Sequence, residues 1–258
     1  IKETAIPGIF KTNPIPANLS KYYDSQDYIS HHQDSGSLKE KLYKFLQNFN
    51  LKYKQSILFD NVGKDKTVLD YGCGAGEFIK YIENNFETFG YEPNHSARTN
   101  ALKKIQKAKL ITNLNLIKEE SLDAITLWHV FEHIENQDEM LQIFYSKLKQ
   151  KGRLIIAVPN PTSYDALKYK EFWAAYDVPR HIFHFSKSGM EKLMNNDLWK
   201  IKKIKPLLLD SFYISMLSEK YQKSSLSWLK GLIYGLVSNI KASKTGEYSS
   251  LIYIIEKK

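Results

Sequence analysis

The sequence predicts an α/β fold, a doubly wound and mostly parallel sheet of seven strands with helices on both of its faces. From residue 67 onward, short β-branched runs alternate with amphipathic stretches of helical period. This alternation is typical of parallel strands joined by right-handed crossover helices. Size and composition agree: 258 residues, 43% hydrophobic and 25% charged, suffice for one such domain with a small appendage and exclude a disordered or fibrous chain.

The elements can be assigned in order along the chain. Residues 1–37 carry three prolines and little periodicity, so we expect an extended arm or lid. Apolar residues then follow a helical spacing, so residues 1–50 are predicted to be an N-terminal arm and helix, and residues 51–258 the main domain. The expected strands are 67–71, 88–91, 109–112, 122–127, 152–158, 201–209 and 250–255. The expected helices are 38–49, 76–85, 94–107, 138–149 and 186–195, the last capped by Ser186.

Residues 210–247 separate the last two predicted strands and are longer than an ordinary hairpin loop, so they are predicted to be an insertion. Apolar residues from Leu226 to Val237 fall on one side of a possible helix. This helix is interpreted either as packed on the protein's own core, or as a dimer surface, a substrate wall or an interfacial membrane helix.

Charge and cysteine content limit the partners and the compartment. The net charge is +9, and the stretch from Lys200 to Lys258 accounts for +7 of it, with eleven lysines and four acidic residues. Such a region fits anionic lipid, nucleic acid or an acidic partner, or is simply a solvated lysine-rich surface. The single cysteine, Cys73, excludes an intrachain disulfide and predicts a reducing, cytoplasmic location. No apolar run reaches the ~18 residues that a spanning helix needs, and the start lacks the pattern of a signal peptide.

The segment VLDYGCGAGEF places an acid, Asp70, at the end of a buried strand and just before a glycine loop. Glycines let the backbone turn tightly and approach a ligand, which in an open α/β sheet lies over the carboxyl ends of the strands. A dinucleotide needs the spacing G-x-G-x-x-G, whereas Gly72, Gly74 and Gly76 give G-x-G-x-G. Asp70 would also repel a pyrophosphate. The loop therefore favours a cationic or amino-bearing ligand over a nicotinamide dinucleotide.

A second acid, Glu92, stands at the end of the next predicted strand, 22 residues after Asp70. A carboxylate at this position can accept hydrogen bonds from both hydroxyls of a ribose. The two acids together predict a ligand that combines a nucleoside with a positive charge.

On the motifs VLDYGCGAGEF, GYEP, LDAITLWHVFEHI and LKQKGRLIIAVPN, the sequence resembles the class I S-adenosylmethionine-dependent methyltransferases, closest to their ubiquinone-biosynthesis-like and small-molecule branches. The resemblance covers about residues 38–209, with 250–255 as the last strand, and implies a Rossmann-like fold in which that last strand is antiparallel. It implies S-adenosylmethionine as cofactor and S-adenosylhomocysteine as product. The cofactor contacts that it implies are Asp70, Gly72, Cys73 and Gly74 at the methionyl part, Glu92 at the ribose, Asn113 and Leu114 at the adenine, and Trp128 and His129 near the methyl group.

The string from His129 to His133 reads H-x-x-E-H, a metallopeptidase signature. Such a site needs the pattern on a helix and a further ligand from elsewhere, whereas this string begins at a strand end of a nucleotide-type fold. Ubiquinone-biosynthesis O-methyltransferases and small-RNA 2′-O-methyltransferases carry E-x-x-E-H here, and some of them hold a divalent cation. This chain has His129 in place of the first Glu, and the loss of a carboxylate weakens an oxygen-rich Mg²⁺ site. We therefore predict no bound metal, and interpret Glu132 and His133 as helix-start side chains that hydrogen-bond the active-site loops.

The segment after the fifth predicted strand resembles the W…D-x-P-x-H…F-S segment of many small-molecule methyltransferases. A histidine suits general-base catalysis near neutral pH, so His181 is the first and His184 the second candidate. Asp177 is predicted to orient one of them, while Trp173 and Arg180 bind the acceptor, Arg180 an acidic one. The alternative is that these residues only build a turn.

Within the N-terminal arm, Tyr23, Tyr28 and His31 are predicted to contact the acceptor as the arm closes and excludes water. Alternatively, the aromatic side chains only pack on the sheet edge. The function predicted is methyl transfer to a small molecule, such as a lipid, quinone or glycan precursor. The alternatives are an RNA or protein methyltransferase, which the basic C-terminal region favours, and a non-catalytic binding module.

Overall fold

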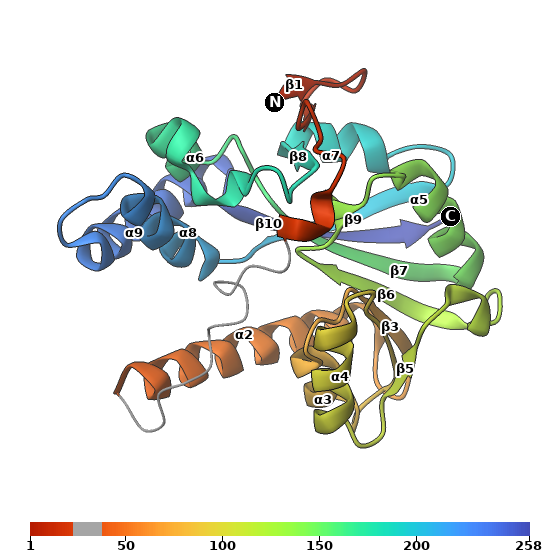
Figure 1. The fold of residues 1–258 in the computed structure, drawn as a ribbon. Coiled ribbons are helices and arrows are strands. Elements are labelled where there is room, and N and C mark those ends of the chain that lie inside the picture. Colours follow the sequence, from red (N-terminus) through yellow and green to blue (C-terminus); the bar gives the residue numbers. More distant parts are fainter. Residues whose placement is uncertain (23–37) are drawn as a thin grey trace. The chain divides into compact units, whose positions relative to one another are not determined.

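The computed structural model describes residues 1–22 and 38–258, and its largest element is a seven-stranded sheet (Figure 1). The chain divides into two units. The first comprises Ile1–Lys52, Pro159–Met190 and Pro206–Ser250, and the second Tyr53–Val158, Glu191–Lys205 and Leu251–Lys258.

The sheet has the strand order β5-β4-β3-β6-β7-β10-β9. Its strands are β3 (Thr67–Tyr71), β4 (Glu87–Tyr91), β5 (Lys109–Ile111), β6 (Leu122–Trp128), β7 (Leu148–Pro159), β9 (Trp199–Pro206) and β10 (Ser250–Lys257). The first five pair in parallel, and the sheet as a whole is mostly parallel with an antiparallel end, so the predicted fold class is confirmed. The order reverses between β3 and β6, the switch point beside which open α/β sheets bind ligands.

The central strands are buried on both faces, as parallel strands covered by helices should be. Val68, Leu69 and Ile125 are fully buried. The second unit contains the helices α3 (Glu77–Ile82), α4 (His95–Lys104) and α5 (Gln137–Lys147). It also contains the C-terminal part of α2 (Leu38–Val62) and the end of α7 (Lys187–Met194).

The helix boundaries differ from the predicted ones for local reasons. α3 begins one residue late because Gly76 adopts a left-handed conformation. α4 also begins one residue late, because Asn94 is its N-cap and accepts a hydrogen bond from the backbone N–H of Ala97, and it ends at Lys104 because Ile105 turns to extended backbone. α2 continues to Val62, well beyond the predicted residue 49.

The first unit contains a small antiparallel sheet that the sequence analysis did not predict. Strands β1 (Lys2–Glu3) and β2 (Ile9–Lys11) pair with each other, and β2 pairs with β8 (Phe183–Phe185). Strands of two and three residues are too short to show a periodic pattern, and the partner of β2 is distant in the sequence. The interpretation of residues 1–50 as a lid, and of 210–247 as an insertion, stays a prediction.

Two helices occupy the predicted insertion, α8 (Asp210–Tyr221) and α9 (Ser227–Thr245). They pack closely: a Cβ built on Gly231 would lie 2.5 Å from the Cα of Met216, and one on Gly235 would lie 2.7 Å from the Cα of Phe212. Beside them, α6 (Tyr164–Tyr169) and the turns that follow it form an apolar cluster with α8 around Trp173. Among the described residues, none of the helices combines the length and apolarity that a membrane crossing requires.

Candidate functional site

The glycine loop follows β3, and its three predicted glycines all have positive φ, at 77°, 53° and 81° for Gly72, Gly74 and Gly76. A Cβ on Gly72 would lie 2.5 Å from Val130, and one on Gly76 would lie 2.8 Å from Ala101, so both positions are closed by packing. A Cβ on Gly74 would meet no described atom within 4 Å. Gly74 is therefore the position at which a ligand can approach the backbone.

Asp70 is the last acid before this loop, and it is 3% exposed. Its carboxylate accepts a hydrogen bond of 2.6 Å from Thr126 Oγ1, because β3 and β6 pair Asp70 with Thr126. Burial raises the pKa of Asp70 to about 7, and the nearby Glu92 charge adds to the effect, while the Thr126 hydrogen bond and the Lys54 charge oppose it. A buried carboxylate with so raised a pKa is a strong partner for a ligand cation. Thr126 and Lys54 were not predicted, since no local motif marks a cross-strand neighbour or a side chain from α2.

Glu92 follows β4 and is held in a fixed orientation. Its Oε2 accepts a hydrogen bond of 2.8 Å from the backbone N–H of Gly74, and its Oε1 accepts one of 2.8 Å from the backbone N–H of Asn94. Each carboxylate oxygen has a second lone pair, so the group can still accept two ligand hydroxyls. Glu92 thus joins the glycine loop to the end of β4, and its predicted contact with a ribose stays a prediction.

Three other predicted cofactor residues, Cys73, Asn113 and Leu114, belong to the second unit. Cys73 is buried and burial raises the pKa of its thiol, so it stays neutral. The Asn113 side chain accepts a hydrogen bond of 2.9 Å from the backbone N–H of Asn115, just before the buried Leu114. Their contact with an adenine stays a prediction.

Trp128 ends β6, and its ring packs edge-on against Phe78 while Lys54 Nζ lies 4.7 Å from the ring centre. His129 follows with a positive φ of 57°, a strained conformation for a non-glycine residue that is frequent at functional sites. The roles of both residues toward a cofactor stay predictions.

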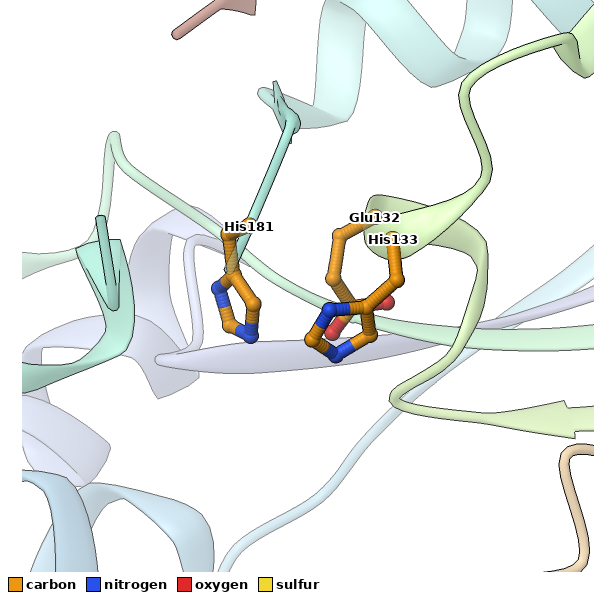
Figure 2. Close-up of side chains that lie close together, drawn as sticks. All are labelled: Glu132, His133 and His181. Atoms are coloured by element: carbon orange, nitrogen blue, oxygen red, sulfur yellow. The ribbon is translucent and has the colours of Figure 1, made fainter. Parts of the chain in front are cut away.

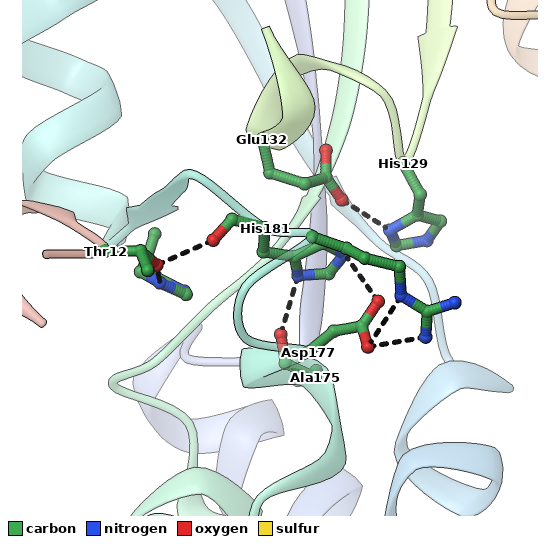
Figure 3. A network of polar contacts seen from close by, with 8 residues as sticks. Thr12, His129, Glu132, Ala175, Asp177 and His181 are labelled. Carbon is green, nitrogen blue, oxygen red and sulfur yellow. Dashed lines mark hydrogen bonds and ion pairs between the residues drawn. The ribbon is translucent and has the colours of Figure 1, made fainter. Parts of the chain in front are cut away.

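Glu132 and His133 share the 3₁₀ turn Phe131–His133 (Figure 2). Glu132 is 1% exposed, and one of its oxygens lies within 4.8 Å of a ring nitrogen of His133. His129 Nδ1 lies 3.4 Å from Glu132 Oε1 (Figure 3). These side chains offer oxygen and nitrogen ligands, but a single carboxylate is a weak basis for a Mg²⁺ site. The predicted absence of a metal stays a prediction.

In the first unit, Thr12 at the end of β2 links the two candidate bases (Figure 3). Its hydroxyl donates to the backbone carbonyl of His181 at 2.7 Å and also contacts His184 Nε2 at 3.1 Å. A hydroxyl has only one proton, so the second contact requires that Nε2 of His184 carries the hydrogen. His184 is 4% exposed and packs edge-on against Tyr176. This nitrogen is therefore a donor to Thr12 and cannot act as a base.

His181 has the opposite tautomer. Its Nδ1 lies 2.9 Å from the backbone carbonyl of Ala175, which only accepts, so Nδ1 carries the hydrogen (Figure 3). The lone pair of the neutral ring is then on Nε2, 3.7 Å from Asp177 Oδ2. Asp177 also accepts hydrogen bonds of 3.1 and 2.6 Å from Arg180 Nε and Nη2. The structure thus brings together three of the predicted residues, His181, Asp177 and Arg180.

Trp173, predicted to contact the acceptor, is 2% exposed, and its indole N–H donates to Asp165 at 2.7 Å. Asp165 also accepts hydrogen bonds from Ser238 and Ser249. Sequence reasoning missed Asp165, because its donors come from distant parts of the chain. The role of Trp173 toward a substrate stays a prediction. Tyr23, Tyr28 and His31 lie outside the described residues.

Comparison with known proteins identifies the protein family that this chain matches. A family model described as a methyltransferase domain matches residues 39–197. The ubiquinone biosynthesis O-methyltransferase of Rickettsia bellii (strain OSU 85-389) is 25% identical over 168 residues, which cover 56% of this chain and 65% of that protein. The chain thus matches slightly under two thirds of the length of this curated relative.

Among solved structures, magnesium protoporphyrin IX methyltransferase from Synechocystis PCC 6803 with bound SAH has a TM-score of 0.59 at 13% identity, covering 92% of this chain and 97% of that one. A SAM-dependent methyltransferase from Archaeoglobus fulgidus has a TM-score of 0.50 at 21% identity, covering 82% of this chain and 94% of that one. At these identities the likeness concerns the fold alone.

Proposed function

The chain belongs to the family of class I S-adenosylmethionine-dependent methyltransferases, and from this premise we propose that it transfers a methyl group from S-adenosylmethionine to a small-molecule acceptor. The observation that carries the proposal is the pair of hydrogen-bonded acids, Asp70 just before the glycine loop and Glu92 on the backbone N–H of Gly74, together with the open space at Gly74.

The residues of the second unit fit this cofactor by chemistry. Asp70 is the group that would hold the ammonium of the methionyl part, because its burial makes a cationic partner strongly favourable. Glu92 is the group that would accept the ribose hydroxyls, and Gly74 leaves room beside the backbone. When bound, S-adenosylmethionine supplies a methyl carbon activated by a neighbouring sulfonium.

On the acceptor side, His181 is the proposed general base. Its Nε2 carries the lone pair, and Asp177 stabilises the ring once this nitrogen has taken a proton from an acceptor hydroxyl or ammonium. Asp177 is a positioning residue, and it is itself held by Arg180. His184, the second candidate, is proposed to support His181 through Thr12.

The acceptor is proposed to be a lipid, quinone or glycan precursor. A phenolic quinone precursor is the first compound to test, because the curated relative is named for ubiquinone biosynthesis. The alternative acceptor, RNA or protein, rests on the basic region from Lys200 to Lys258.

The test measures transfer of labelled methyl groups into small-molecule, RNA and protein fractions of a cell extract. We expect label in the small-molecule fraction. Label only in RNA or protein would refute the acceptor class, and no label in any fraction despite tight S-adenosylhomocysteine binding would favour a non-catalytic module.

A second measurement tests the base. His181→Gln should lower kcat at saturating cofactor by about 100-fold, the contribution typical of a general base, and should leave the affinity for S-adenosylhomocysteine unchanged. His95→Gln is the matched control, since His95 is exposed on α4. Unchanged turnover in His181→Gln would mean that this histidine is structural.

A further inference from the structure

Helix α9 has its small side chains inside and its large apolar side chains outside. Gly231, Gly235, Ser238 and Ala242 are its buried residues, and the two glycines pack against α8. The opposite side carries five large apolar residues that are between 39% and 55% exposed, Leu229, Leu232, Ile233, Leu236 and Ile240. We call these five the outer stripe. Packing against α8 therefore does not account for the large side chains of this helix.

The outer stripe is continuous along the helix. Its members are spaced by three or four residues or are adjacent, which places them on one face over about three turns. A contiguous apolar surface of this kind on a soluble domain marks a contact with a partner or a membrane. Trp228, at the start of the helix, is 58% exposed and extends this surface.

The charged residues of α9 itself are all positive. α9 contains Lys230, Lys241 and Lys244 and no acidic residue. Lys230 and Lys241 are 11 residues apart, about three helical turns, so they lie along the same edge of the stripe. Two further exposed lysines, Lys220 and Lys223, lie at and just after the end of α8. The surface thus combines an apolar stripe with a cationic edge.

We propose that α9 is a membrane-surface helix whose outer stripe inserts into the interface of a bilayer that contains anionic lipid. An apolar face with lysines on its flank is the pattern of helices that lie in the interfacial plane. Each lysine near an anionic surface adds to the attraction, and tryptophan favours the headgroup region.

Other occupants fit the surface less well. The helix does not meet the requirements for crossing a bilayer. A two-fold contact with a second copy through the stripe would bring lysines of α9 next to lysines of the other α9, with no acidic residue on either helix. Nucleic acid would meet the lysines, but leucine and isoleucine side chains contribute little to phosphate binding. The inference is independent of the acceptor and of catalysis.

The first experiment is sedimentation of the full chain with vesicles of phosphatidylcholine, with and without 30% phosphatidylglycerol. We expect binding to the anionic vesicles, weakened by salt. Leu232→Gln/Leu236→Gln should reduce the partition coefficient by at least about tenfold. The matched control is Leu102→Gln/Leu198→Gln, which changes two exposed leucines of the other unit and should leave binding unchanged.

The second experiment separates the charge from the apolar contribution. Lys244→Gln should weaken binding to anionic vesicles by about fivefold. Emission from Trp228 should shift to the blue on binding, and the shift should disappear in Trp228→Phe, because Trp173 and Trp199 are already buried and the half-buried Trp128 belongs to the other unit.

Three results would overturn the proposal. One is absence of binding to anionic vesicles by the folded protein. Another is equal binding of the wild type and the double leucine variant. The last is a dimer in solution that Leu232→Gln/Leu236→Gln dissociates, since the stripe would then be covered by a second copy.

Discussion

Asp70 and Glu83 lie near opposite ends of the segment that contains the glycine loop and α3, and both are buried, at 3% and 4% exposure. Their surroundings differ. Glu83 accepts hydrogen bonds of 2.9, 2.8 and 3.0 Å from the backbone N–H groups of Gln106, Lys107 and Ala108, and one of 2.7 Å from Lys80 Nζ. Asp70 accepts one from the hydroxyl of Thr126.

The two carboxyls therefore titrate in opposite directions. Burial alone raises the pKa of each, but at Glu83 the backbone donors and Lys80 outweigh burial and lower the pKa to about 2. At Asp70 burial prevails and the pKa rises to about 7. The Glu83 carboxylate stabilises a turn, whereas ionised Asp70 costs stability. This difference fits the proposed role of Asp70 as the partner of a ligand cation.

The largest expected effect belongs to Asp70→Asn. It should weaken S-adenosylhomocysteine binding about 100-fold in calorimetry, because a buried charged hydrogen bond to the ligand ammonium is lost. The free energy of unfolding of this variant should rise at high pH, although its affinity for the ligand falls. The folded-state pKa of about 7 exceeds the ordinary value of 3.8, so the wild type loses stability as pH rises from 4 through 7.

At pH 8 the Asp70→Asn variant should therefore be more stable than the wild type, by about 2–4 kcal/mol in the free energy of unfolding. Thermal unfolding at pH 5 and pH 8 measures this difference. If Asp70→Asn bound S-adenosylhomocysteine as tightly as the wild type, or were less stable than the wild type at pH 8, the proposed difference between Asp70 and Glu83 would be wrong.

Glu83→Gln should act on stability alone. It should lower the free energy of unfolding by about 2 kcal/mol at pH 7 without changing cofactor affinity. Because the pKa is lowered from 4.5 to about 2, the stabilisation is present above pH 4.5 and is lost as pH falls through about 2. Denaturant titration measures the effect. Glu87→Gln on the exposed surface of β4 is the control, and an equal loss in that variant would contradict the assignment.

The pH dependence of cofactor binding is a third way to test the comparison. Only ionised Asp70 attracts an ammonium, so the wild-type affinity for S-adenosylhomocysteine should fall about tenfold between pH 8 and pH 6. Asp70→Asn should lack this dependence. A pH-independent affinity in the wild type would show that Asp70 does not hold the ligand.

The smallest effect is expected at the loop itself. Gly74→Ala should weaken cofactor binding about fivefold, because its Cβ would occupy open space beside the ligand. Gly63→Ala is a matched control: Gly63 has a φ of 89° and also no described atom within 4 Å of a built Cβ. Both variants should lose about 1 kcal/mol of stability from strained backbone. Equal affinity of Gly74→Ala and Gly63→Ala for S-adenosylhomocysteine would mean that the ligand does not bind beside Gly74.

Most strands and helices of the second unit could be predicted, because the sequence patterns that indicate them involve residues close together in the chain. Alternating strand and helix periods predict the sheet, and the tight turn predicted from the three glycines is formed with positive φ at Gly72, Gly74 and Gly76. Asp70 and Glu92 were found because Asp70 is the last but one residue of β3 and Glu92 directly follows β4. The resemblance to class I methyltransferases, carried by these same motifs, is confirmed.

The sequence by itself determined the order of strands and helices in the second unit, the glycine loop and its two acids, because each depends on neighbours within about ten residues. Only the tertiary structure decided the tautomer of His184, since the Thr12 hydroxyl that contacts its ring lies 172 residues away in the sequence. It also decided which side of α9 faces inward. Helical period predicts that a stripe exists, but the close approach of α8 selects the glycine side for burial and leaves the large apolar residues in contact with solvent.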